Sequence, residues 1–293
     1  MPVGSRLRIY TIHRICDSAF RDCTSMRRLV VENDRVKIGE RAFENCASLE
    51  SIQLPDGMTE IYGGVFNSCK SLRSICLPQH LTILGESAFS DCEGLEEIVV
   101  PENVTKIDDL TFNGCTGLKS VTLNNGLRKI GKSAFKNCRM LTRIEIPESV
   151  AFIDNAPFRG CESMKSIQVA PRNKYFKSAP SKRDGNDFVL FNKNKSILIA
   201  YPASSREVQY DVPDSVVTIS DWAFSECRKL SRITIPDSVH DIGEGGLLQL
   251  RPAGRGGDPR LRDPHGRLRF PWLRQSGACA DPGLRKGPWL GTV

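Results

Sequence analysis

Cysteines are the side chains whose type and spacing most suggest chemistry in this 293-residue chain, because a thiolate can attack a substrate or bind a metal ion. Most of the 11 cysteines form one row with a period of 23 residues, broken once: Cys23, Cys46, Cys69, Cys92, Cys115, Cys138, Cys161 and Cys227. Metal ligands must converge on one point, whereas one thiol per repeat does not converge. An odd total also favours free thiols over a closed set of disulfides. We therefore expect buried structural thiols that hydrogen-bond the neighbouring turn, with Cys16 and Cys76, outside the row, exposed.

The four histidines do not suggest a catalytic site. His13, His80 and His240 lie at different phases of the repeat, and His265 lies beyond it. None has a serine, cysteine or carboxylate partner at a recurring spacing. We expect no P-loop, no dinucleotide-binding GxGxxG motif and no HExxH metalloprotease motif. The sequence therefore predicts no enzyme, no catalytic residues, no bound metal and no cofactor.

Phenylalanines repeat with the same period as the cysteines, within the motif A-F-x-x-C and its variants. They are Phe20, Phe43, Phe66, Phe89, Phe112, Phe135, Phe158 and, after a longer interval, Phe224. The full unit reads L-x-x-I-x-I-P, a spacer, I-G and then A-F-x-x-C. Alternating apolar residues before a proline predict a short strand with one buried face, and the A-F-x-x-C segment predicts a short helical or irregular turn. One unit cannot bury its own apolar face, so the units must stack.

Two segments match a family consensus nearly letter for letter: LTRIEIPESV at 141–150 and LSRITIPDSVHDIG at 230–243. The chain thus resembles the BspA-like leucine-rich-repeat family, with repeats of the Treponema pallidum type, over roughly residues 10–245. The resemblance implies an α/β repeat solenoid, a right-handed leucine-rich-repeat-like stack with one short β-strand per 23-residue coil. Proteins that this chain resembles are often cell-surface adhesins or recognition proteins of bacteria and protists.

The period is interrupted between the seventh and eighth units. Residues 170–212 resemble a modified hairpin repeat that many such proteins carry, and Asn192–Lys195 read as the hairpin turn. We expect an exposed loop near residues 178–186, a common place for binding residues. The alternative is a domain boundary at this point.

Residues 246–293 are rich in Arg, Gly and Pro and lack the repeat, a composition that predicts disorder. Read one base later, Gly246–Leu250 can encode A-F-F-N-C, and Arg269–Leu273 can encode A-F-R-G-C 23 residues further on. Both keep the phase of the array. Our hypothesis is a frameshift near codon 246 that ended the true array, which the transcript sequence across this codon decides.

The formal net charge of +7 belongs mostly to that tail. Residues 246–293 have nine Lys/Arg and three Asp/Glu. Residues 1–245 have 32 Lys/Arg and 31 Asp/Glu, which nearly cancel. The near-neutral body favours neither nucleic acid nor an anionic membrane as partner. The chain has no stretch of about 18 apolar residues, which membrane insertion would need. Its start lacks the pattern of a secretory signal. The sequence leaves the localisation unknown.

The outward positions of the expected strands form the candidate binding face. They are Ser51, Gln53, Ser74, Cys76, Glu97, Val99, Ser120, Thr122, Arg143, Glu145, Ser166, Gln168, Arg232 and Thr234. Such a broad, weakly patterned face suits a protein or a glycoconjugate better than a small molecule. We therefore predict a non-catalytic interaction scaffold. The alternatives are a merely solvated face, a repeat fragment of a larger regulatory or enzyme-containing protein, and a frameshift product without function.

Overall fold

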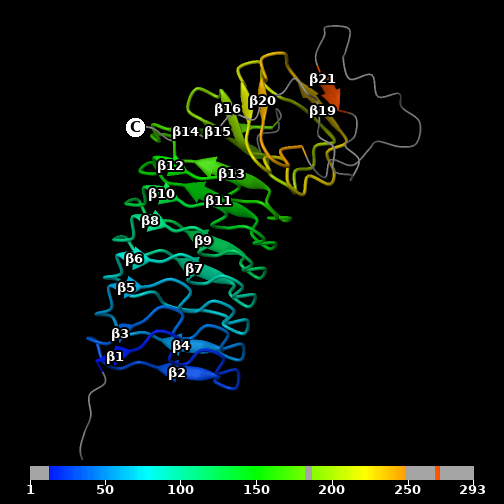
Figure 1. The fold of residues 1–293 in the computed structure, drawn as a ribbon. Coiled ribbons are helices and arrows are strands. Elements are labelled where there is room, and N and C mark those ends of the chain that lie inside the picture. Colours follow the sequence, from blue (N-terminus) through cyan, green and yellow to red (C-terminus); the bar gives the residue numbers. More distant parts are fainter. Residues whose placement is uncertain (1–12, 182–186, 248–267, 271–293) are drawn as a thin grey trace, which may run out of the picture.

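The chain folds as a solenoid of stacked coils (Figure 1), and the computed structural model describes residues 13–181, 187–247 and 268–270. Most regular coils contribute one strand to a first row, and the coil of Ser74 contributes an isolated bridge to Ser51 instead. These strands are β2 (Arg28–Val30), β4 (Ser51–Gln53), β7 (Glu97–Val99), β9 (Ser120–Thr122), β11 (Arg143–Ile146), β13 (Ser166–Val169), β17 (Gln209–Asp211) and β19 (Arg232–Ile235). Neighbouring strands pair in parallel with a register of one repeat, as Arg28 does with Ser51 and Glu97 with Ser120. Residues that pair between neighbouring strands are therefore one repeat of 23 residues apart in the sequence.

A second row of shorter strands runs along the opposite side of the stack. It consists of β1 (Arg14–Ile15), β3 (Lys37–Ile38), β5 (Glu60–Ile61), β6 (Ile83–Leu84), β8 (Lys106–Ile107), β10 (Lys129–Ile130), β12 (Phe152–Ile153), β18 (Thr218–Ile219) and β20 (Asp241–Ile242). These strands also pair in parallel, as Ile130 does with Ile107 and Ile153. The expectation of one strand per coil is therefore wrong, because the I-G segment forms a strand as well.

The described residues contain no helix, so the helical part of the expected α/β class is wrong. Backbone conformation in the A-F-x-x-C segment gives the reason. Residues two before and two after a phenylalanine have left-handed φ angles, as Arg41 (53°) and Asn45 (59°) do around Phe43. A helix needs consecutive right-handed residues. The N–H of Phe43 instead donates to the carbonyl of Val65 in the next coil, at 3.0 Å. The right-handed sense of the stack stays a prediction.

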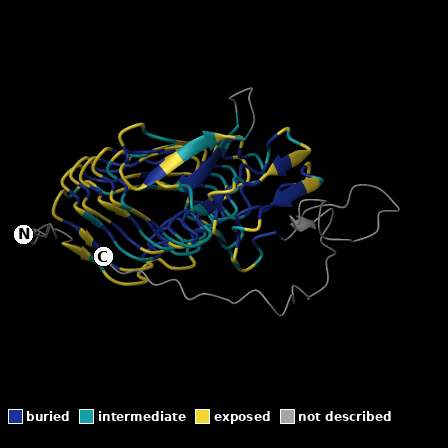
Figure 2. Ribbon diagram, turned by 90° about the horizontal axis from the view of Figure 1, so that it is seen from above, coloured by how far each residue is buried: buried dark blue, intermediate teal, exposed yellow. Residues whose placement is uncertain are grey.

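The core is a continuous row of side chains inside the coils. Six pairs of phenylalanine rings from Phe20 to Phe158 stack along the axis with centroids 5.3–5.9 Å apart. The leucine and isoleucine rows of the repeat are buried beside them, and Figure 2 shows the buried residues inside the coils with the exposed ones on the turns. The predicted repeat register is confirmed by this packing.

The interruption contains an antiparallel hairpin, as the sequence predicts. Strands β14 (Phe176–Pro180), β15 (Phe188–Asn192) and β16 (Ile197–Ala200) pair antiparallel, and β16 then continues in parallel into β18 and β20. Residues 182–186 of the expected loop lie outside the described residues. The boundaries of this unit stay a prediction.

Within the tail, β21 (Leu268–Phe270) pairs antiparallel with β19, so these three residues differ from the disorder expected there. Leu247, in the phenylalanine register, is 5% exposed and belongs to the core. Residues 248–267 and 271–293 lie outside the described part, and the prediction of disorder there is untested.

Candidate binding surface

The outer face of the first row of strands, called the strand face below, carries most of the predicted binding residues. Side chains alternate across a strand, so Ile52 is buried while its neighbours Ser51 and Gln53 are exposed. The same alternation exposes the other predicted residues of the face: Ser74, Cys76, Glu97, Val99, Ser120, Thr122, Arg143, Glu145, Gln168 and Arg232. The structure therefore brings these positions together in parallel columns along the stack.

Two predicted residues are not accessible on this face, which corrects the sequence-based set. Ser166 is 1% exposed and Thr234 is 8% exposed. Ser166 opens β13, and the N–H of Ser204 donates to the carbonyl of Met164 at 2.7 Å, so the chain that returns from the hairpin runs beside it. Thr234 lies opposite Arg269 in the pairing of β19 with β21. Both positions follow the alternation of the repeat, but both are buried in the folded chain.

One column of the strand face, the one that runs through Val99, is low in charge in its middle, whereas the neighbouring column carries the exposed Glu97. Val99 is 62% exposed, and one repeat to either side of it lie the exposed Cys76 and Thr122. Val30 on β2, which the sequence-based set omitted, is 57% exposed. Isolated exposed apolar residues are common on protein surfaces. Here they share one column with small polar side chains, whereas Arg143 and Glu145 lie further along the stack.

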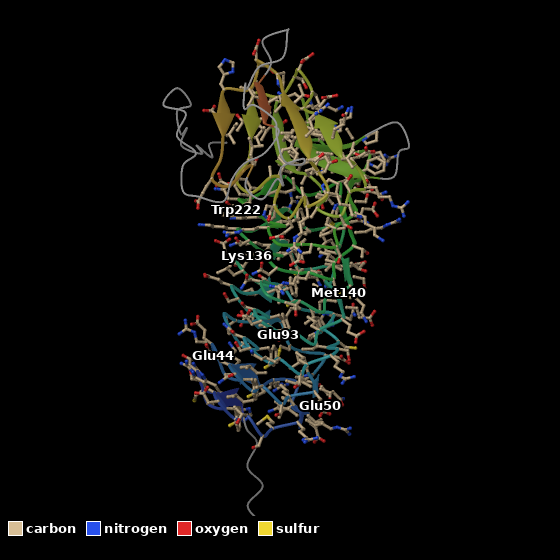
Figure 3. The ribbon with its side chains drawn as sticks, turned by 90° about the vertical axis from the view of Figure 1, so that its right-hand side faces the viewer. Glu44, Glu50, Glu93, Lys136, Met140 and Trp222 are labelled. Atoms are coloured by element: carbon tan, nitrogen blue, oxygen red, sulfur yellow. The ribbon has the colours of Figure 1, made fainter. Side chains whose placement is uncertain are left out.

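A groove of about 450 Å³ runs beside the strand face, over the turns that precede the strands. Gly94 and Gly117 are among its lining residues, and ion pairs lie along it, with Lys70 2.9 Å from Glu93 and Lys119 2.6 Å from Glu96. Figure 3 shows Glu50, Glu93 and Met140 in order along this side. Sequence reasoning missed the groove, although small residues stand two positions after most cysteines of the row, as Ser71, Gly94 and Gly117 do.

The predicted burial of the cysteine row is confirmed from Cys46 onward, whereas Cys23, in the first coil, is only partly buried. From Cys46 to Cys161, each thiol donates a hydrogen bond of 3.1–3.3 Å to the phenylalanine carbonyl of the preceding coil. Burial raises the pKa of Cys46 to about 11 and those of Cys69 and Cys161 to about 12. These thiols stay protonated and unreactive near neutral pH. Cys16 and Cys76 are exposed, as expected.

The row of thiols brings no metal site together. Within the described residues, no group of three or more His, Cys, Asp or Glu side chains converges as metal ligands would. His13, His80 and His240 are exposed at separate places, and His265 lies outside the described residues.

The expectation of no P-loop overlooked one motif match. Residues 126–133 read GLRKIGKS, which fits the P-loop spacing G-x-x-x-x-G-K-S. A P-loop holds phosphate with free backbone amides before a helix. Here the N–H of Gly131 donates to Ile107, that of Lys132 to the carboxylate of Asp109 and that of Ser133 to Asn155, at 2.9–3.0 Å. Because these amides are already bonded and no helix follows, the match does not make a phosphate site.

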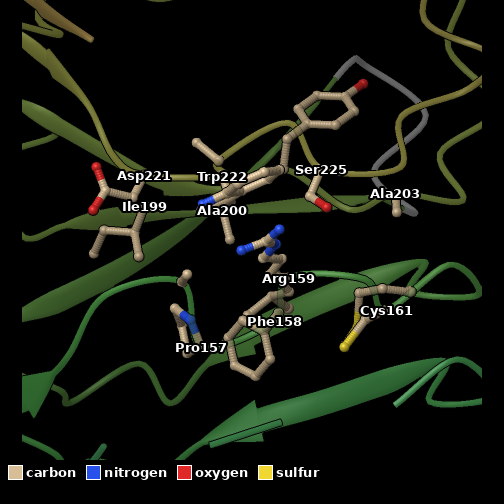
Figure 4. Close-up of a pocket in the computed structure, with 15 residues that line it drawn as sticks. Pro157, Phe158, Arg159, Cys161, Ile199, Ala200, Ala203, Asp221, Trp222 and Ser225 are labelled. Atoms are coloured by element: carbon tan, nitrogen blue, oxygen red, sulfur yellow. The ribbon is translucent and has the colours of Figure 1, made fainter. Parts of the chain in front are cut away.

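A small enclosed space lies where the hairpin unit meets the regular coils. Figure 4 shows Arg159 against the ring of Trp222, and its guanidinium carbon lies 3.3 Å from the ring centroid. The backbone N–H of Gly160 donates to the hydroxyl of Ser225 at 3.2 Å. The space accessible to a water molecule there is about 10 Å³, which is room for one water and no larger ligand.

The chain belongs to the family described as the BspA type leucine rich repeat region. The family model matches residues 8–116, 85–182 and 203–249 with six copies, which together make up more than half of the chain. The resemblance found in the sequence is therefore confirmed. Among the curated proteins, none matches the chain.

Solved structures of bacterial leucine-rich-repeat proteins resemble the chain. A leucine rich cell surface protein from Faecalibacterium prausnitzii is 29% identical, with a TM-score of 0.72, over 84% of this chain and 65% of that one. A leucine-rich repeat protein from Eubacterium ventriosum is 23% identical, with a TM-score of 0.54, over 77% of this chain and 57% of that one. The pneumococcal vaccine antigen PcpA is 21% identical, with a TM-score of 0.58, over 86% of this chain and 57% of that one.

The last two similarities establish the fold alone, because their identities are below a quarter. The chain spans less than two thirds of the length of each of these three structures. None of the matches described above shows a catalytic family. The part of the chain that the structure describes contains no helix able to cross a membrane.

Proposed function

We propose that the chain is a non-catalytic scaffold that binds another protein through the strand face. The observation that carries the proposal is the low-charge column around Val99, which is 62% exposed between Cys76 and Thr122. The centres of protein interfaces are depleted in charge and surrounded by polar residues. The charged groove beside the face and the pair Arg143 and Glu145 further along would form such a polar rim.

The family supports a repeat scaffold, and the similar F. prausnitzii protein is described as a cell surface protein. A glycoconjugate is the second candidate for the strand face. We favour a protein, because the face is broad and its predicted residues include no exposed aromatic ring on which a sugar could stack. Ser166 and Thr234 are left out of the proposed contact because they are buried.

The exposed thiol of Cys76 allows a direct test. A maleimide photo-cross-linker attached to Cys76, in a chain with Cys16→Ser, Cys23→Ser and Cys279→Ser, should cross-link a protein from an extract of the source cells. Buried thiols with raised pKa values do not compete for the label. The matched control carries Cys76→Ser and Thr105→Cys, which moves the label to an exposed residue near the second row.

The expected result is a protein band from the Cys76 label that the Thr105→Cys label does not give, and that Val99→Lys removes. A band of equal strength from both labels would mean that the strand face is not the binding surface. Specific capture of glycans on an immobilised array, with no cross-linked protein, would favour the second candidate.

A further inference from the structure

The hairpin of the interrupted unit has one side whose side chains the proposed function does not use. The N–H of Lys193 donates to the carbonyl of Tyr175 at 2.7 Å, which extends the pairing of β14 with β15 by one residue pair. Lys177 lies opposite Phe191 in the same pairing. Directly opposed residues share a face of a sheet, so Tyr175, Lys177 and Lys193 lie on one side of the hairpin.

A third lysine joins this side from the turn that follows β15. The Nζ of Lys195 lies 5.8 Å from the centroid of the Phe191 ring. Tyr175 is 52% exposed, and both Lys177 and Lys193 are exposed. Figure 2 shows the exposed segment of β14 beside the largely buried β15. We call Tyr175, Lys177, Lys193 and Lys195 the hairpin platform.

The charge of the platform is not neutralised by the described part of the protein. No carboxylate in the described residues forms an ion pair with its three lysines, whereas Lys70, Lys106, Lys119 and Lys129 each have one. Asp187, the carboxylate at the start of β15, instead accepts hydrogen bonds from the Ser205 hydroxyl at 2.7 Å and the Arg206 N–H at 3.2 Å. Lys193 Nζ donates to the carbonyl of Asn173, which is a neutral partner and leaves the positive charge in place.

We propose that the hairpin platform binds an acidic polysaccharide, a site separate from the strand face. Carboxylate or sulfate groups along the polymer would meet Lys177, Lys193 and Lys195. The ring of Tyr175 would lie against the apolar face of a sugar, and its hydroxyl would bond a polar group there. Clustered lysines of this kind are typical of surfaces that take heparin-like polyanions.

Other polyanions fit the platform less well. Single-stranded nucleic acid is held by a series of aromatic rings on which successive bases stack, and the platform has one exposed ring. An acidic peptide could add as a strand to the outer edge of β14. That edge ends in Pro180 and carries Lys177, two features that disfavour strand addition.

The test compares two triple variants of the full chain with equal loss of charge. The platform variant is Lys177→Gln, Lys193→Gln and Lys195→Gln. The control is Lys37→Gln, Lys132→Gln and Lys229→Gln, which removes three exposed lysines elsewhere that form no ion pair in the described part. Both retain the basic tail. Lys177→Gln alone is used if the platform variant loses its cooperative unfolding transition.

The probes are heparin, which is sulfated, and polygalacturonate, which carries carboxylates only. We expect the platform variant to bind at least one of them about tenfold more weakly, with the control changed less than about twofold. The slope of log Kd against log salt should fall by about two to three. With three fewer lysine contacts, binding releases fewer counterions from the polymer. The more tightly bound probe identifies the anionic group.

Three results would overturn the proposal. The first is an equal loss of affinity in both variants, which would mean that only net charge matters. The second is binding of polyglutamate or oligo(dT) to the platform as tight as that of either polysaccharide. The third is no effect of Tyr175→Ser, which we expect to weaken polysaccharide binding about threefold without changing the salt slope.

Discussion

Among the individual residues, those of the cysteine row hold neighbouring coils together. Each thiol from Cys46 to Cys161 is buried and bonds the carbonyl of a neighbouring coil. Each of these carbonyls also accepts the backbone N–H of the cysteine in its own coil, as Phe43 does from Cys46, so the thiol adds a second bond that links two coils. A reactive cysteine would need an exposed position and a lowered pKa. The row has the opposite properties.

Raised thiol pKa values predict a loss of stability in alkali. An unfolded cysteine has its ordinary pKa of 9.0, whereas burial raises the pKa of folded Cys69 to about 12. The stabilisation is therefore fully present below pH 9 and is lost as pH rises through this interval. We expect the unfolding temperature of the parent protein to fall steadily above pH 9. It should fall less steeply in the double variant that carries Cys69→Ala and Cys161→Ala. Thermal unfolding followed by circular dichroism checks this, and identical slopes in both proteins would contradict it.

Among the elements, the phenylalanine row stacks some of the largest fully buried side chains of the protein from one coil to the next. Phe89 is fully buried, with its ring 5.3 Å from that of Phe66 and 5.8 Å from that of Phe112. Two-residue strands such as β8 and β10 bury too little surface to be stable alone. The rows of side chains, and not the individual strands, therefore hold the stack.

Phe89→Ala should lower the free energy of unfolding by about 3–5 kcal/mol, because it leaves a cavity between two rings. Urea unfolding followed by circular dichroism measures the change. Phe152→Ala is the matched control, since Phe152 is 44% exposed on β12 and its loss leaves no internal cavity. Similar losses in the two variants would mean that the row is not the source of stability.

Across the whole molecule, the hairpin divides the interior into two cores. Leu190 and Ile199 pack into the core of the earlier coils, whereas Val189, Phe191 and Leu198 pack into that of the later coils. The stacking of phenylalanines ends at Phe158, and a new stack begins with Tyr201 on Phe224, 5.2 Å apart. Figure 1 shows the later coils set at an angle to the earlier ones. Contacts of Arg159 and Gly160 bridge the two parts.

Arg159→Met should weaken the coupling between the two cores by about 1 kcal/mol, because the guanidinium no longer lies on Trp222. With Trp272→Phe and Trp289→Phe, fluorescence reports Trp222 alone. In urea, we expect fluorescence and circular dichroism to change together in the parent, and fluorescence to change first in the variant. Arg139→Met, which breaks an exposed pair with Glu162, is the control. Coincident transitions in both variants would contradict the prediction.

The amino-acid pattern was sufficient to predict the repeat, its register, the buried rows and the hairpin turn. A period of 23 residues forces identical side chains to stack, so Phe89 and Cys92 could be assigned to the core from spacing alone. All predicted residues of the binding face except Ser166 and Thr234 are also exposed, as alternation predicts. Local pattern is sufficient for these features because each coil contacts mainly its immediate neighbours.

Features that depend on contacts outside one repeat could be seen only in the folded chain. The A-F-x-x-C segment contains residues that a helix tolerates, but its amides bond the next coil and left-handed residues interrupt it. Ser166 keeps the alternation of the repeat and is nevertheless buried, at the point where the chain that returns from the hairpin bonds Met164. Within the hairpin platform, Lys177 is distant in sequence from Lys193 and Lys195 and meets them only through the antiparallel pairing of β14 with β15. Spacing along the chain determines which residues are equivalent, whereas packing across the interruption determines which of them are accessible.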